Sequence, residues 1–83
     1  MTTTYKVKTT FKSFEGCNNL ITGKTIGTDS LNFFESIDGI VDTDLLEEGE
    51  GYAIIEVTID EAMSKPVPKF KKDKFGIENY TFI

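Results

Sequence analysis

Residues 3–14 alternate with a period of two, and this alternation constrains the fold more than any other feature of the chain. One set of side chains is mainly apolar and the other mainly basic: Tyr5, Val7, Thr9 and Phe11 against Lys6, Lys8, Thr10 and Lys12. The pattern is typical of a β-strand with one buried and one solvated face. We expect the lysines to protect an edge strand, with a row of phosphate contacts as the alternative.

Residues 20–26 are predicted to form a second, short strand, bent at Gly23. Gly16, Asn18 and Asn19 precede it and favour a turn. We therefore expect the first two strands to pair as an antiparallel hairpin.

Residues 52–59 are predicted to form the central strand, because both of their alternating sets contain apolar side chains. Residues 76–83 alternate Tyr80 and Phe82 with Thr81 and Ile83, which predicts a last strand.

Two short helices are expected beside this sheet. Thr28, Asp29 and Ser30 are good N-caps, and Gly39 is a suitable stop, so the first helix is predicted over residues 30–37, although its spacing also fits a strand. The second is predicted over residues 60–64, between a capping box at Thr58–Glu61 and Pro66. Residues 38–51 are expected to be loops around a short ordered piece.

These segments predict an α+β fold with an antiparallel sheet of about four strands and one or two short helices packed on one face. At 83 residues the chain is expected to be a single domain spanning residues 1–83. It contains no apolar run near the roughly 20 residues that a membrane helix needs, and its single cysteine, Cys17, suits a reducing compartment. We therefore expect a cytoplasmic protein that does not bind membranes.

The charges are divided along the sequence. Residues 25–64 contain eleven carboxylates and no lysine, whereas all nine lysines lie outside this acidic block. In a chain selected only for stability, interspersed lysines would relieve such repulsion. Their absence indicates that the negative field itself has a use.

Several chemistries lack the residues they need. The chain has no His, which removes the commonest general base and transition-metal ligand, and no Arg, which removes the bidentate clamp for phosphate. Asp42 and Asp44 begin an acidic segment, but apolar Leu45 and Leu46 follow where a calcium loop needs ligands and glycine. We therefore expect no catalytic residue, no metal site and no cofactor.

A basic and aromatic tract over residues 65–75 favours a different function. Its lysines could neutralise phosphates while Phe70, Phe75 and the later Tyr80 stack on bases. Binding of single-stranded nucleic acid is therefore an alternative, although the acidic block would repel a polyanion.

The acidic block predicts a surface that binds a basic protein, and nucleic-acid-binding proteins are the commonest such partners. The carboxylates expected to contact the partner are Glu35, Asp38, Asp42, Asp44, Glu47, Glu48 and Glu50. Ile40, Val41, Leu45 and Leu46 lie between them and could supply apolar anchors. The resulting hypothesis is an inhibitor or modulator that presents carboxylates where phosphates would lie, with an interaction or assembly subunit without mimicry as the alternative.

In size and charge the chain is similar to small acidic proteins of bacterial viruses that inhibit nucleic-acid enzymes of the host, including defence nucleases. The resemblance implies an anti-defence role. It rests on bulk properties of the whole chain and assigns no role to any residue.

Overall fold

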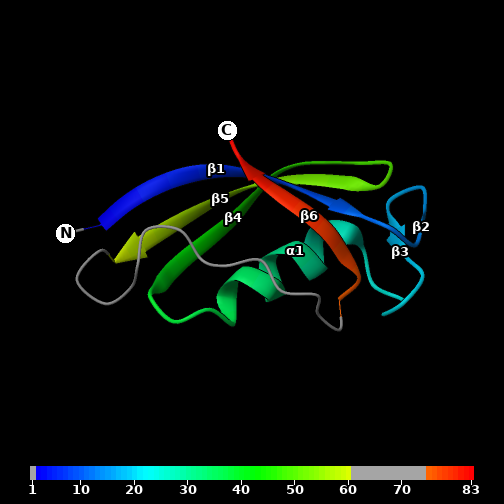
Figure 1. Ribbon diagram of the computed structural model, residues 1–83, viewed down its shortest axis with the longest axis horizontal. Helices are drawn as coiled ribbons and strands as arrows, with labels where there is room; N and C mark the ends of the chain where they lie inside the picture. Colours follow the sequence, from blue (N-terminus) through cyan, green and yellow to red (C-terminus); the bar gives the residue numbers. More distant parts are fainter. Residues whose placement is uncertain (1, 61–74) are drawn as a thin grey trace.

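The computed structural model describes residues 2–60 and 75–83 and has an α+β fold, as expected (Figure 1). A four-stranded antiparallel sheet has the order β4-β5-β1-β6, a helix packs on one of its faces, and β2 and β3 form a small separate sheet. The elements are β1 (Thr2–Phe11), β2 (Phe14–Glu15), β3 (Asn18–Asn19), α1 (Ile26–Glu35), β4 (Ile40–Gly49), β5 (Tyr52–Asp60) and β6 (Ile77–Phe82). No helix in these two ranges has the length and apolar character that a membrane crossing requires.

Strands β1 and β5 confirm the alternation expected of them, and they are the two inner strands of the sheet. Val7 of β1 and Ile55 of β5 are buried opposite each other, whereas Lys6 and Glu56 form the next pair on the other face. The expected edge position of β1 is wrong, because β5 pairs with one side of this strand and β6 with the other. The lysines of β1 therefore project from the middle of a sheet face.

The hydrophobic core lies between the sheet and α1. It consists of Val7, Phe11, Ile26, Phe33, Phe34, Ala53, Ile55, Val57, Ile59 and Ile77. Edge-to-face aromatic contacts extend it, with Phe34 of α1 at 5.0 Å from Phe33 and 5.4 Å from Tyr80 of β6 between ring centroids. The opposite face of the sheet, here called the open face, has no helix of the described residues packed on it (Figure 1).

Strand β4 occupies the segment predicted as loops, and this prediction is wrong. Its ten residues pair with β5 along an outer edge of the sheet. The register shifts between Ile40 and Asp42 and again between Leu45 and Glu47, which leaves Val41 and Leu46 without a partner on β5. Each shift is a β-bulge that breaks the alternation by one residue. The period-two signal is therefore lost although the strand is present.

The second predicted strand is also wrong, because residues 20–24 form turns and α1 begins at Ile26. Thr25 caps the helix: its hydroxyl accepts a hydrogen bond from the backbone N–H of Thr28 at 3.3 Å. The predicted caps Asp29 and Ser30 lie inside the helix and are buried. The helix expected over residues 30–37 therefore exists, but it begins four residues earlier and ends at Glu35.

The remaining predicted elements have different outcomes. Strand β6 confirms the last predicted strand, with Tyr80 and Phe82 half-buried and Thr81 and Ile83 exposed. Asp60, the expected start of a second helix, is the last residue of β5. The rest of that predicted helix lies outside the described residues.

A buried polar cluster connects the segment 12–25 to the rest of the fold. The Nδ2 group of Asn19 donates to Asp29 Oδ2 at 2.9 Å and to the carbonyl of Phe75, and its Oδ1 accepts from the Ile21 N–H at 2.9 Å. The hydroxyl of Thr22 also donates to Asp29 Oδ2. One side chain thereby joins β3, α1 and the segment that leads into β6.

Candidate functional site

Most of the predicted site residues follow the edge strand β4. Asp42, Asp44, Glu47 and Glu48 belong to β4, Glu50 lies in the turn after it, Asp38 lies in the turn before it, and Glu35 ends α1. Because β4 lies at an outer edge of the sheet, the fold places these carboxylates in an extended row, here called the acidic edge. The row is not a compact cluster, since its two ends are separated by the length of the strand.

The acidic edge is divided between the two faces of the sheet. Asp42, Asp44 and Glu47 pair with β5 residues of the open face, whereas Glu48 pairs with buried Ala53 and lies on the side of α1. Gly27 provides the space for Glu48, because a Cβ at Gly27 would approach Glu48 Oε2 to 2.5 Å. Three carboxylates of β4 therefore share one solvent-facing surface, and the fourth is half-buried behind them.

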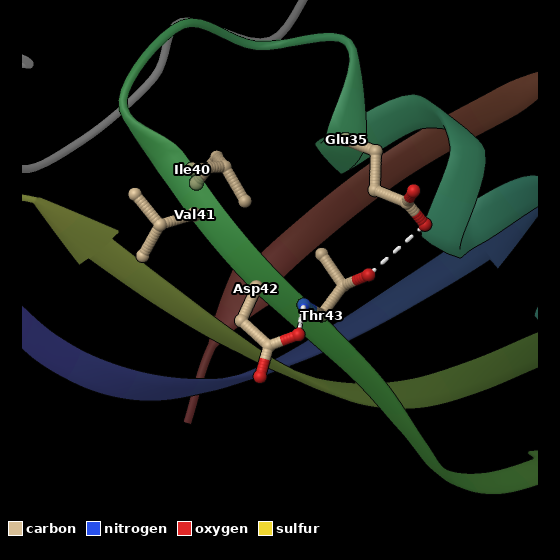
Figure 2. Close-up of a pocket in the computed structure, with 5 residues that line it drawn as sticks. All are labelled: Glu35, Ile40, Val41, Asp42 and Thr43. Atoms are coloured by element: carbon tan, nitrogen blue, oxygen red, sulfur yellow. Dashed lines mark hydrogen bonds between the residues drawn. The ribbon is translucent and has the colours of Figure 1, made fainter.

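A shallow pocket of about 290 Å³ lies at the start of the acidic edge, between the end of α1 and β4 (Figure 2). It is lined by Glu35, Ile40, Val41, Asp42 and Thr43. The Thr43 hydroxyl donates to Glu35 Oε2 and its backbone N–H donates to Asp42 Oδ1, both at 3.0 Å. Figure 2 shows the two carboxylates on either side of Thr43, one from the helix and one from the strand. The pocket thus presents a mainly polar surface on which Thr43 orients two carboxylates.

A second fixed carboxylate lies near the other end of β4. The Tyr52 hydroxyl donates to Glu47 Oε2 at 2.5 Å, and this bond to a negative charge raises the pKa of Tyr52 above its usual value. Lys8 of β1 places its Nζ atom 5.0 Å from the centroid of the same ring. Tyr52 and Lys8 were not among the predicted site residues, because only the register of three strands brings them beside Glu47.

The carboxylates of the acidic edge are spread out, and the thiol of the chain lies in a separate turn. Within residues 2–60 and 75–83, no three carboxylate or cysteine side chains are grouped closely enough to hold a metal ion. Cys17 is a free, exposed thiol in the turn between β2 and β3. The chemistry that the acidic edge offers is hydrogen-bond acceptance and attraction of cations.

The basic tract of the nucleic-acid alternative lies outside the described residues, except for Phe75. That ring packs edge-on against Phe33 of the core at 6.4 Å. Tyr80 packs against Phe34, and burial raises the pKa of its hydroxyl. Two of the three rings expected to stack on bases are therefore engaged with the core.

Taken together, the fold and the acidic edge define a small α+β domain with a carboxylate-lined edge strand. No protein-family model matches the chain, and neither a curated protein nor a solved structure matches it.

Proposed function

We propose that this protein is a small acidic protein-binding module that inhibits or modulates a basic partner by charge mimicry. The partner is a nucleic-acid-binding protein, and the class that fits the size and charge of the chain is a viral inhibitor of a host or defence nuclease. The observation that carries the proposal is the acidic edge, in which four carboxylates lie on the outer strand β4 and three more flank it in the adjoining turns and at the end of α1.

Strand geometry supports the mimicry. Asp42 and Asp44 are two residues apart on the open face without a register shift between them. Alternate residues of a strand advance by about 6.6–6.8 Å. Successive phosphates of one DNA strand have a similar separation, because the backbone winds around the helix axis while it rises by about 3.4 Å per nucleotide. Carboxylates on this face can therefore occupy positions that correspond to successive phosphates in a basic groove.

The bulges of β4 add apolar contacts to this charged row. Val41 is 54% exposed and Leu46 is 44% exposed, although both side chains are fully apolar. Charges at the rim of an interface mainly accelerate and orient association, whereas buried apolar anchors contribute most of the affinity. The pocket beside Val41 is mainly polar and holds Glu35 and Asp42, so the ammonium group of a lysine from the partner could bind there while Val41 packs at its rim.

The same strand favours a second candidate function. Charged side chains and bulges are ordinary devices that keep an outer strand from pairing with other chains. In that case the carboxylates maintain solubility, and the protein is an interaction or assembly subunit that binds through another surface.

Capture from bacterial lysate at low salt separates the two candidates. The variant Asp38→Asn/Asp44→Asn removes two carboxylates of the acidic edge, and the control Glu15→Gln/Glu78→Gln removes two exposed carboxylates elsewhere, with the same change in net charge. We expect the first variant to bind the captured basic protein at least about tenfold more weakly and the control to bind as wild type. The melting temperature of the first variant should be unchanged or raised.

Equal binding by both variants would overturn the proposal, because the position of the carboxylates would then not matter. The captured protein must also lose activity on nucleic acid when the wild-type protein is added. Direct binding of labelled single-stranded DNA at low salt would favour the nucleic-acid alternative.

A further inference from the structure

The open face carries two parallel stripes of opposite charge. Lys6 of β1 lies opposite Glu56 of β5, which lies opposite Asp44 of β4. In the next row, Lys8 lies opposite Ile54, which lies opposite Glu47. Each row therefore has an ammonium group on the β1 side and a carboxylate on the β4 side, with β5 between them.

Both stripes are accessible to another molecule. Lys6, Lys8, Asp44 and Glu47 are exposed, whereas Glu56 and Ile54 between them are half-buried by their neighbours. Helix α1 packs on the opposite face of the sheet (Figure 1).

We infer that this open face associates with the open face of a second copy of the chain, around a two-fold axis parallel to β5. Rotation about such an axis exchanges the β4 side with the β1 side but preserves the position along the strands. Asp44 of the second copy then faces Lys6, and Glu47 of the second copy faces Lys8. The contact is isologous, as in most homodimers, so each charge match occurs twice.

Other face-to-face arrangements lack this match. A two-fold axis perpendicular to the strands would place β4 over β4 and oppose acids with acids. Sheets that pack face to face are aligned to within about 30° and lie about 10 Å apart, which long Lys and Glu side chains can span. Charge therefore selects a single orientation for the pair.

The centre of the proposed interface is partly apolar and partly preorganised. Ile54 and Tyr52 lie on β5, next to the axis, and would meet their counterparts there. Tyr52 already fixes Glu47 by its hydroxyl and Lys8 by its ring, so these side chains lose less freedom on association. The two Glu56 carboxylates would approach and repel each other across the interface, although each lies beside the Lys6 of its own copy. Because of this repulsion, we expect a weak dimer.

Self-association would cover two carboxylates of the acidic edge. This regulatory consequence rests on the proposed function: a basic partner that uses Asp44 and Glu47 would have to separate the two copies. Self-association itself does not depend on the proposed function, because it can be measured with the purified protein alone.

Sedimentation equilibrium of the full chain with charge-reversed variants tests the inference. We expect a monomer–dimer equilibrium for the wild type and a dissociation constant at least tenfold higher for Lys6→Glu/Lys8→Glu and for Asp44→Lys/Glu47→Lys. An equimolar mixture of the two variants should regain the dimer mass, because both stripes of one variant are then acidic and face the two basic stripes of the other. Both variants retain a negative net charge, so bulk attraction cannot explain such recovery.

Lys24→Glu reverses the charge of an exposed lysine before α1 and is the matched control for Lys6→Glu. This control variant should associate as wild type. Glu47→Lys removes the acceptor of the Tyr52 hydroxyl. If Asp44→Lys/Glu47→Lys unfolds for this reason, the single variants Asp44→Lys and Lys6→Glu replace the two double variants as the complementary pair. A wild type that stays monomeric up to millimolar concentration, or a mixture that stays monomeric, would overturn the inference.

Discussion

At the scale of single residues, buried hydrogen bonds decide how the connecting segments are held. Asn19 is only 1% exposed and connects three parts of the chain through one amide group. The sequence predicts a turn residue at this position, whereas Asn19 belongs to β3 and the turns lie on either side of this short strand. Its partners on α1 and before β6 follow from the tertiary fold and have no signal in the neighbouring sequence.

Asn19→Ala should lower the free energy of unfolding by about 2–3 kcal/mol, because the mutation leaves buried Asp29 with one donor fewer and the Phe75 carbonyl without this donor. Urea denaturation measures the loss. Asn18→Ala alters the neighbouring exposed asparagine and should change stability by less than about 0.5 kcal/mol. Similar losses for the two variants would contradict the role assigned to Asn19.

Glu47→Gln should lower the pKa of Tyr52 toward its usual value, because the amide can still accept a hydrogen bond but carries no charge. Since the pKa of Tyr52 is raised in the folded state, its contribution to stability is complete below the unfolded pKa. That contribution is lost as the pH rises through the folded pKa. Ultraviolet titration in a Tyr5→Phe/Tyr80→Phe background isolates the group, and Glu50→Gln is the control. An unchanged pKa in Glu47→Gln would exclude the contact.

At the scale of elements, regular alternation decides what the sequence can predict. Strands β1 and β5 keep a period of two over their length, and β6 keeps it from Asn79 to Phe82, after a register shift beside Ile77; the sequence predicts all three. Strand β4 was not, because the extra residues Val41 and Leu46 put its apolar side chains out of phase. The start of α1 differs from the prediction for another reason: the pattern of residues 20–26 is that of a strand, and it conceals the capping role of Thr25.

The turn between β4 and β5 depends on a glycine that no other residue replaces without strain. Gly51 has a φ of +75°, and a Cβ there would approach the Phe14 ring to 2.7 Å. Gly16 has a φ of +61°, but a Cβ at that position would meet nothing within 4 Å. Gly51→Ala therefore combines backbone strain with a steric clash, whereas Gly16→Ala has the strain alone.

We expect Gly51→Ala to cost about 2–4 kcal/mol and Gly16→Ala about 1 kcal/mol, as measured by the urea midpoint at constant slope. The difference between the two variants reports the contact between Phe14 and the turn. Phe14→Ala in the Gly51→Ala background should recover part of the loss. Equal losses for the two glycine variants would show that the ring moves aside at no cost.

At the scale of the whole molecule, the fold reorganises a charge division that is already visible in the sequence. The contiguous acidic block predicted a negative surface, and the fold places much of it along one edge. The sequence carries no sign that Lys6 and Lys8 share a face with Asp44 and Glu47, because this depends on the pairing of β1 with β5, in which Lys6 lies opposite Glu56. Local patterns predict which side chains a strand exposes, whereas the topology determines which charges become neighbours.

The inner position of β1 also has a consequence for biosynthesis. This strand leaves the ribosome before both of its neighbours in the sheet, which are residues 52–60 and 77–82. Such distant pairing slows folding and leaves the early strand without its partners. The nascent protein must therefore hold an unpaired, half-apolar strand in solution until both of these later segments have been synthesised.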